Sequence, residues 1–362
     1  GGATGSSLSL ASDQSDVGKY FRVTAVTTDS FGGTTNFTSS ATSAVSNVND
    51  SPTGSVVISG TATEDQVLTA SNNLADLDGL GSISYQWVRA GSDIGGATGS
   101  SYTLTQADVG SVMTVKASYT DALSTSESVT SSATSAVSNV NDSPTGSVVI
   151  SGTATEDQVL TASNNLADLD GLGSISYQWV RAGSDIGGAT GSSYTLTQAD
   201  VGSVMTVKAS YTDALSTSES VTSSATSAVA NIEDEASGTL SVTGVASEGS
   251  SLGISFSPSD PDGSISTVYQ WQVSSDNSSW SDIGGATGSS LSLASDQSDV
   301  GKYFRVTAVT TDSFGGTTNF TSSATSAVSN VNDSPQITSI PSYSAVEDQG
   351  FRYKLVATDV DP

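Results

Sequence analysis

The sequence contains no cysteine and no histidine, and it has few basic residues. Without cysteine the chain forms no disulfide, and without histidine it has no His-based catalysis and no typical zinc or haem site. Only 10 Lys and Arg stand against 37 Asp and Glu, which gives a net charge of −27. That charge excludes the electrostatic footprint of a nucleic-acid-binding protein and disfavours contact with an anionic membrane. It leaves a solvating surface or carboxylates that hold cations.

Long apolar runs and helical patterns are missing as well. No segment approaches the length of a membrane span, no signal peptide is evident, and the first residue is not Met. We therefore expect a segment of a longer protein. No stretch has a capped apolar stripe of 3.6-residue period, whereas short alternating segments are separated by Gly, Ser, Asn and Asp. The sequence predicts an all-β protein.

Internal repetition is the strongest signal in the chain. Residues 51–137 recur unchanged as 143–229, and residues 284–335 are identical to residues 1–52. The first pair defines a type B repeat and the second a type A repeat. We predict the C-terminal half of an A repeat at 1–50, B repeats at 51–142 and 143–234, an A repeat at 235–333, and the N-terminal part of a further domain at 334–362. Duplicated modules extend a chain or multiply a weak contact, which favours a structural role over catalysis.

Within one B repeat, six segments have the alternation expected of strands, at 55–60, 66–71, 82–87, 102–105, 112–120 and 126–138. The inward faces of the third and fifth segments are expected to carry Ile83, Tyr85 and Trp87, and Met113, Val115, Ala117 and Tyr119. Six or seven short strands with a Trp on the third match the size and pattern of a β-sandwich.

These residues carry a family resemblance. The Tyr-Gln-Trp strand, the Ile-x-Gly-Ala-Thr turn region and the Asp-Val-Gly corner resemble immunoglobulin-like domains. The A repeat reads Asp299-Val300-Gly301-Lys302-Tyr303, similar to the Asp-x-Gly-x-Tyr corner of that fold, whereas the B repeat has Val112 at the Tyr position. The inter-sheet cysteines are missing, so packing around Trp87 and Tyr85 must join the sheets. As a whole, the chain resembles the immunoglobulin-like, cadherin-like repeats of giant secreted RTX-type bacterial adhesins.

Four kinds of acidic cluster recur in the repeats. They are a Glu, mostly followed by Asp, between the first two strands, an Asp-x-Asp after the second strand, an Asp before the last hairpin, and an Asn-x-Asn/Glu-Asp linker. The members are Glu64 with Asp65, Glu156 with Asp157, Glu248, and Glu347 with Asp348; Asp76 and Asp78, Asp168 and Asp170, Asp260 and Asp262, Asp359 and Asp361; Asp29, Asp121, Asp213 and Asp312; and Asn47, Asn49 and Asp50, Asn139, Asn141 and Asp142, Asn231, Glu233 and Asp234, Asn330, Asn332 and Asp333.

On a seven-strand sandwich these clusters lie at the ends of the domains. Glu64 of one domain, the linker 139–142, and the acidic turns of the next domain are then expected to converge. Six to eight hard oxygen ligands are what Ca²⁺ requires. The set resembles the interdomain calcium sites of cadherins, and because the middle-loop acidic pair of cadherins has no match, the resemblance implies one or two ions per junction. The alternative is that these Asp and Asn residues are ordinary turn formers.

The functional hypothesis is a structural extender of a bacterial cell-surface or extracellular adhesin or filament, a linear rod of domains stiffened by calcium. Its expected partners are the neighbouring repeats and, in a filament, other copies, with no nucleic acid, no membrane insertion and an unknown surface ligand. One alternative is a set of weak multivalent carbohydrate- or matrix-binding repeats. Another is lateral assembly into an extracellular fibre or sheath, as in a biofilm. No segment predicts an enzyme.

Overall fold

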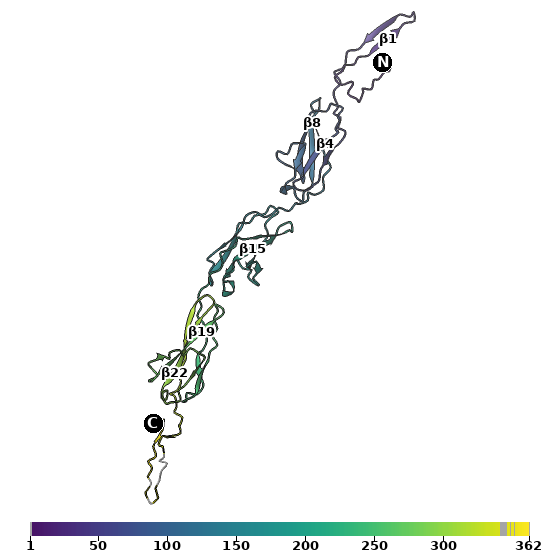
Figure 1. Ribbon diagram of the computed structural model, residues 1–362. Coiled ribbons are helices and arrows are strands. Elements are labelled where there is room, and N and C mark those ends of the chain that lie inside the picture. Colours follow the sequence, from purple (N-terminus) through teal and green to yellow (C-terminus); the bar gives the residue numbers. More distant parts are fainter. Residues whose placement is uncertain (1, 341–345, 348, 351, 362) are drawn as a thin grey trace. The chain divides into compact units, whose positions relative to one another are not determined.

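The computed structural model describes residues 2–340, 346–347, 349–350 and 352–361 (Figure 1). The chain divides into two compact units. The first contains Gly1–Ser147, Asn165–Ile175 and Ser210–Val221, and the second contains Val148–Asn164, Ser176–Ala209 and Thr222–Pro362. The helices among the described residues are two single 3-10 turns, η1 (Gln106–Asp108) and η2 (Gln198–Asp200). Within this part of the chain, no helix has the length and apolar character needed to cross a membrane.

The first unit contains the sandwich of the first B repeat. One sheet has the order β3-β4-β7 and the other β6-β5-β8-β9, and all neighbours are antiparallel. The strands are β3 (Val56–Ser59), β4 (Val67–Asn72), β5 (Ser84–Arg89), β6 (Ser92–Asp93), β7 (Ser101–Thr103), β8 (Met113–Thr120) and β9 (Ser126–Thr130). These orders are A-B-E and C′-C-F-G of the immunoglobulin fold. The predicted all-β, immunoglobulin-like class is confirmed.

The core of this sandwich forms because alternate strand residues point inward. Trp87, Leu68, Leu104, Met113 and Val115 are all 0 % exposed. The Trp87 indole N–H donates to the carbonyl of Gly99 at 3.0 Å, so the polar atom of the buried ring is satisfied. Truncating such a ring to Ala costs about 3–5 kcal/mol. The central Trp thus joins the two sheets in a repeat that has no disulfide, as the sequence predicts.

The predicted last strand is shorter than expected. It ends at Thr130, and beyond it the Ser131 hydroxyl accepts the N–H of Val115 while the Thr134 hydroxyl accepts the N–H of Met113, both at 3.0 Å. Side-chain oxygens therefore replace the backbone acceptors that a regular ladder would supply. The segment then forms only single bridges, such as that between Val109 and Val137.

The second B repeat forms the same set of strands, with sheet orders β10-β11-β14 and β13-β12-β15-β16. They are β10 (Val148–Ser151), β11 (Val159–Asn164), β12 (Ser176–Arg181), β13 (Ser184–Asp185), β14 (Ser193–Thr195), β15 (Met205–Thr212) and β16 (Ser218–Thr222). Trp179 is 0 % exposed, like its counterpart Trp87. The two identical B repeats therefore bury the same tryptophan at the centre of their sandwiches.

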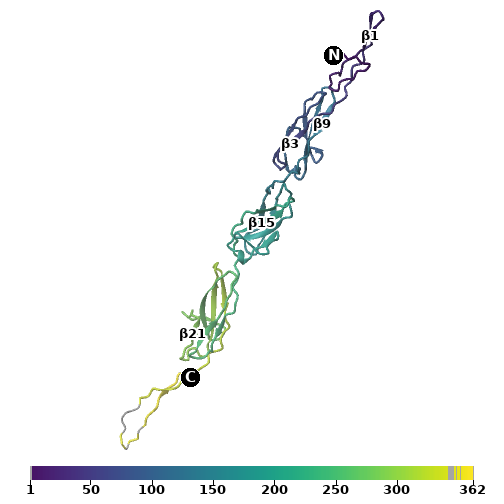
Figure 2. The same ribbon diagram turned by 90° about the vertical axis from the view of Figure 1, so that its right-hand side faces the viewer.

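The A repeat of the second unit, green in Figure 2, has sheet orders β17-β18-β21 and β20-β19-β22-β23. The strands are β17 (Ser241–Thr243), β18 (Ser251–Ser255), β19 (Ser266–Ser274), β20 (Ser281–Asp282), β21 (Ser290–Ser292), β22 (Tyr303–Thr311) and β23 (Thr317–Thr321). Phe304 and Val306 point into the core beside Trp271, whereas the corner residue Tyr303 lies on the opposite face of β22 and is half-buried. Because this position points away from the core, the Val112 of the B repeat removes no core contact.

Four further short strands lie toward the ends of the chain. They are β1 (Thr24–Thr28) paired with β2 (Thr34–Thr38), and β24 (Gln336–Ile337) paired with β25 (Ala357–Thr358). The five domain limits given above stay predictions.

Candidate metal centre

The acidic clusters gather around the four linkers, which we call junction 1 (residues 47–50), junction 2 (139–142), junction 3 (231–234) and junction 4 (330–333). At junction 2, one carboxylate oxygen each of Glu64, Asp142 and Asp170 lie within 4.8 Å of one another. The same holds for Glu156, Asp234 and Asp262 at junction 3, and for Glu248, Asp333 and Asp361 at junction 4. Residues from a turn, a linker and a following repeat are thus brought to one point.

The Asp-x-Asp loop positions its two carboxylates differently. Asp168 accepts the N–H of Asp170 at 2.9 Å and, through its other oxygen, the hydroxyl of Tyr211. Asp168 is therefore a turn former whose oxygens are both in use. Asp170 is 3 % exposed, and its Oδ2 accepts the N–H of Asp142 at 2.8 Å. The corresponding linker N–H groups donate to Asp78, Asp262 and Asp361.

The hairpin before the last strand supplies a further buried carboxylate. Oδ1 of Asp213 accepts the N–H groups of Leu215 and Thr217, both at 2.8 Å. These bonds close the turn and hold the side chain in one orientation. Its Oδ2 is buried and has no hydrogen-bond donor. One oxygen of Asp213 is therefore structural and the other is free to serve as a ligand.

Glu64 reaches the linker from the turn between β3 and β4. The next residue, Asp65, has a φ of 62°, which turns the chain sharply after Glu64. Glu64 is 3 % exposed and accepts the N–H of Val140 at 3.3 Å. Burial raises its pKa; the Val140 N–H opposes that shift, and the charges of Asp142 and Asp170 reinforce it. Burial likewise raises the pKa of Glu156 and of Asp142.

Buried oxygens without a donor recur in the same three places at junctions 1, 2 and 3. They are Oδ1 of a linker Asn, Oδ1 of the second Asp of the Asp-x-Asp loop, and Oδ2 of the hairpin Asp, namely Asn47, Asp78 and Asp121; Asn139, Asp170 and Asp213; and Asn231, Asp262 and Asp312. A buried acceptor with no partner costs about 1–3 kcal/mol. The ion pairs formed by the described residues lie elsewhere, at Asp16, Asp108, Asp200 and Asp299. Acidic groups arranged in this way could hold a divalent cation.

Not every predicted residue lies in these groups. Asp76, Asp168 and Asp260 accept the backbone N–H two residues on, and Asp359 is exposed and does the same for Asp361. The Asn49 and Asn141 amides donate away from the clusters, to Glu127 and Glu219. Asn332 donates to the carbonyl of Asp333. Asp29 holds its own hairpin, and Asp348 lies outside the described residues.

A glutamine that the sequence analysis did not single out also contacts these carboxylates. The Gln297 amide donates to Glu248 at 3.1 Å and to Asp361 at 2.6 Å, and that of Gln14 donates to Asp50 at 2.7 Å. The signal was available, because a Gln stands two residues before the corner Asp in every repeat. Its oxygen is buried without a donor at Gln14, Gln106 and Gln198. We include this Gln among the residues of the candidate site.

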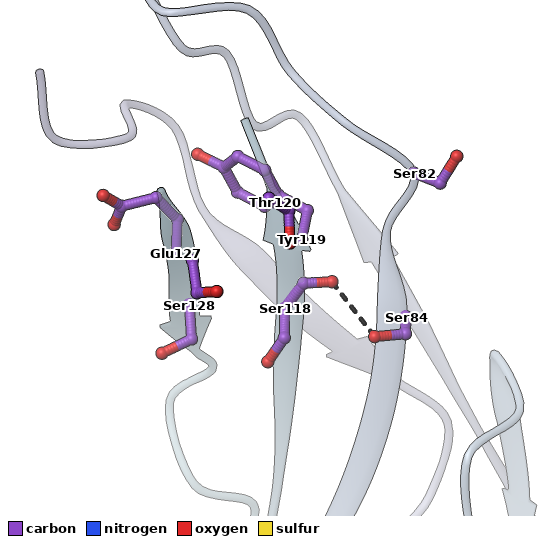
Figure 3. Close-up of a pocket in the computed structure, with 8 residues that line it drawn as sticks. Ser82, Ser84, Ser118, Tyr119, Thr120, Glu127 and Ser128 are labelled. Carbon is purple, nitrogen blue, oxygen red and sulfur yellow. Dashed lines mark hydrogen bonds between the residues drawn. The ribbon is translucent and has the colours of Figure 1, made fainter. Parts of the chain in front are cut away.

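A polar groove of about 420 Å³ lies over β5, β8 and β9 of the first B repeat (Figure 3). Serine hydroxyls line it, and the hydroxyl of Ser84 donates to the carbonyl of Ser118. Tyr119 is only 5 % exposed and its hydroxyl is bonded to Asp76, while Glu127 accepts the amide of Asn49. The Tyr119 ring that lines this groove is therefore not exposed as a flat surface for stacking. The Glu127 carboxylate of the groove is bonded to the linker residue Asn49.

No family model and no curated protein matches the sequence. Several solved structures resemble it at low identity. One is a "Ca2+-stabilized adhesin" that "helps an Antarctic bacterium reach out and bind ice", with 13 % identity, a TM-score of 0.30, and 86 % of this chain and 81 % of that chain covered. A tetra-tandem repeat from the extending region of a large adhesion protein has 16 % identity and a TM-score of 0.28 over 84 % of this chain and 81 % of that one. Cadherin domains 3–6 of protocadherin gamma B2 have 14 % identity and a TM-score of 0.32 over 81 % and 79 %. Adhesin repeats are thus among the structures that this chain resembles.

Proposed function

We propose that this chain is a structural extender segment of a bacterial cell-surface or extracellular adhesin, and that calcium stiffens its domain junctions. The observation that carries the proposal is the recurrence of one set of buried, donor-less oxygens at successive linkers. A binding or catalytic site needs to occur only once, whereas a device that fixes one repeat against the next is needed at every linker. Repetition of the site therefore follows the repetition of the linker.

The chemistry of the donors supports calcium as the cation. At junction 2, Glu64 would supply an oxygen from one repeat, Asp142 and Asn139 from the linker, and Asp170 and Asp213 from the next repeat. All are carboxylate or amide oxygens, which are the ligands that Ca²⁺ prefers, whereas zinc sites are built mainly from Cys and His. Bound calcium neutralises carboxylates that otherwise repel one another. It thereby links the turn, the linker and the following repeat into one body.

Extension is favoured over the carbohydrate-binding alternative by the groove of the B repeat. Ligand sites are lined mainly by apolar and aromatic side chains. Serine hydroxyls line this groove instead, and its Tyr119 is buried with the hydroxyl bonded to Asp76. The proposed role is mechanical and needs no reaction. Its partners are the adjoining repeats of the same chain.

Calorimetric melting in calcium and in chelator tests this proposal. A cation that binds only the folded state stabilises it by about 2.7 kcal/mol per site at a hundredfold excess over Kd, and extracellular modules bind in the range of about 10⁻⁴–10⁻³ M. We expect millimolar calcium to raise the melting transitions of the chain. Asp170→Asn keeps an acceptor for the Asp142 N–H but removes a ligand charge, so it should abolish the gain contributed by junction 2.

The matched control is Asp185→Asn, which removes the same charge from an exposed position in β13. It should leave the calcium response intact. Equal melting curves in calcium and in chelator would contradict the proposal, and these residues would then be ordinary turn formers.

A further inference from the structure

Junction 3 differs from the other linkers at two positions, Ile232 and Glu233, and only the second difference changes the charge. Glu233 stands where Asn49, Asn141 and Asn332 stand in junctions 1, 2 and 4. One oxygen each of Glu233, Asp262 and Asp312 lie within 4.8 Å of one another. This group adjoins the group of Glu156, Asp234 and Asp262 described above, because Asp262 belongs to both. Junction 3 therefore brings five carboxylates together, and one of them, Asp262, belongs to both groups.

The hairpin that faces Glu233 differs in charge from the hairpin at junction 2. At junction 2 the Asn141 amide donates to Glu219 at 2.8 Å. In the A repeat Thr318 occupies the position of Glu219, and its hydroxyl instead accepts the N–H of Ala236 at 2.9 Å. The negative charge has thus moved from the hairpin to the linker.

A second exchange in the hairpin makes room for this charge. Gly316 takes the place of Thr217, and a Cβ atom at Gly316 would overlap the Glu233 carboxylate. Gly316 has no positive φ, so its φ does not call for glycine, and a Cβ atom there would displace the far end of the Glu233 side chain. All six hairpin positions from Ser313 to Thr318 differ from those of the B repeat, and two of them, Gly316 and Thr318, bear on Glu233 in this way.

Two deeply buried oxygens point to a ligand at this place. Asp262 is 1 % exposed and Asp312 is 8 % exposed. Oδ2 of Asp262 accepts the Asp234 N–H, and Oδ1 of Asp312 accepts N–H groups of its own hairpin. The remaining oxygen of each, Oδ1 of Asp262 and Oδ2 of Asp312, is buried without a donor. Desolvation raises the pKa of Glu233, and the charge of Asp312 adds to that shift.

We propose that junction 3 holds a second divalent cation, between Glu233, Asp262 and Asp312, beside the one assigned to Glu156, Asp234 and Asp262. Asp262 would be shared by the two cations, and so would Asp312, because its counterpart Asp213 is a proposed ligand of the first cation at junction 2. The inference rests on the proposed function for the first cation only. At junction 2 the equivalent place has the neutral Asn141, whose amide N–H faces Glu219, so it lacks the charge to hold a second ion. The junction that leads from a B repeat into an A repeat is therefore the more strongly cation-loaded one.

Calcium stoichiometry of the 362-residue chain tests the second cation. Glu233→Gln keeps the shape of an exposed side chain and removes only its charge, so the chain should fold as before. Isothermal titration with CaCl₂ should give one bound ion fewer per chain than the unmodified protein. The matched control Glu219→Gln changes a carboxylate at junction 2 that lies outside the proposed ligands, and it should leave the number unchanged.

A transplant provides the converse measurement. The triple variant Asn141→Glu, Thr217→Gly and Glu219→Thr rebuilds the junction 3 arrangement at junction 2, and it should bind one more calcium ion. A Glu233→Gln chain that binds as many ions as the unmodified one would overturn the second cation and leave the proposed function standing. An absence of calcium binding in every chain would overturn both.

Discussion

Asp108 is the most deeply buried charge of the B repeat, and its surroundings account for its tolerance there. It is 0 % exposed and accepts hydrogen bonds from Arg89 Nε at 2.6 Å, Tyr102 Oη at 3.0 Å and the Thr105 N–H at 2.8 Å. Burial by itself raises the pKa of Asp108, but the bonds from Arg89, Thr105 and Tyr102 outweigh it and hold that pKa below its ordinary value. The carboxylate thus fastens the corner before β8 to the end of β5.

Removing this carboxylate leaves several donors unpaired. We expect Asp108→Ala to lower the free energy of unfolding of its repeat by about 2–4 kcal/mol, somewhat less than for a fully buried pair because the Arg89 side chain is 32 % exposed. Urea unfolding and, separately, calorimetric melting measure the change in the free energy of unfolding. Asp200→Ala in the identical repeat should have the same effect.

The control is Asp299→Ala in the A repeat. There the equivalent carboxylate pairs with the 40 % exposed Lys302 at 3.6 Å, so the loss should be about 1 kcal/mol or less. If Asp108→Ala costs no more than this control, the buried shell around Asp108 contributes nothing to stability.

At the scale of elements, the junctions bring turn, linker and hairpin residues together, and the charged groups that meet there are carboxylates of like charge. The ordinary pKa of Glu is 4.5, and burial raises that of Glu64 and Glu156 in the folded chain. A group with a raised folded pKa binds more protons when folded. Its contribution to stability is therefore complete below about pH 4.5 and is lost as the pH rises through the folded pKa. Asp108 has the opposite sign, and its contribution is lost only as the pH falls through its lowered pKa, below 3.8.

The raised pKa of the junction glutamates predicts that the melting temperature varies with pH, and that calcium reverses the direction of this change. In calcium-free buffer the melting temperature should fall as the pH rises from about 4.5 toward neutrality. The reason is that Glu64 ionises near Asp142 and Asp170, and Glu156 ionises near Asp234 and Asp262. In saturating calcium it should rise over the same range, since deprotonated carboxylates bind the cation better. Melting curves at stepped pH in both buffers measure this. Parallel pH profiles in the two buffers would show that the junction carboxylates do not bind calcium.

At the scale of the whole molecule, the effect of calcium on one linker is expected to recur at each junction. Because the carboxylates of a cation-free junction repel one another, each linker is expected to sample many orientations, and calcium should restrict them. The effect on dimensions accumulates with the number of junctions, whereas the effect on each sandwich core does not.

Small-angle scattering of the 362-residue chain follows this accumulation. We expect calcium to increase the radius of gyration and the maximum dimension relative to chelator, with no change in far-ultraviolet circular dichroism. Asp170→Asn should give an intermediate value, because it loosens one junction and leaves the others bound. A radius of gyration that does not respond to calcium would mean that packing alone sets the linker geometry.

The sequence by itself determined the features that depend on neighbours along the chain. Strand alternation placed Trp87, Met113 and Val115 in a core, and the repeats fixed an all-β class of duplicated sandwiches. Turn-forming Asp and Asn residues indicated where the domains are expected to end. These patterns are readable because side-chain direction in a strand alternates with a period of two residues.

Only the tertiary structure decided which oxygens meet. Glu64 lies 76 residues from the Val140 whose N–H it accepts, and Asp142 lies 28 residues from Asp170. Nothing in the local pattern separates Asp168, whose oxygens are used by Asp170 and Tyr211, from Asp170, which keeps a free buried oxygen. The sequence likewise did not predict that Gly316 leaves room for Glu233. Such pairings depend on how distant turns pack together, and local residue preferences do not carry that information.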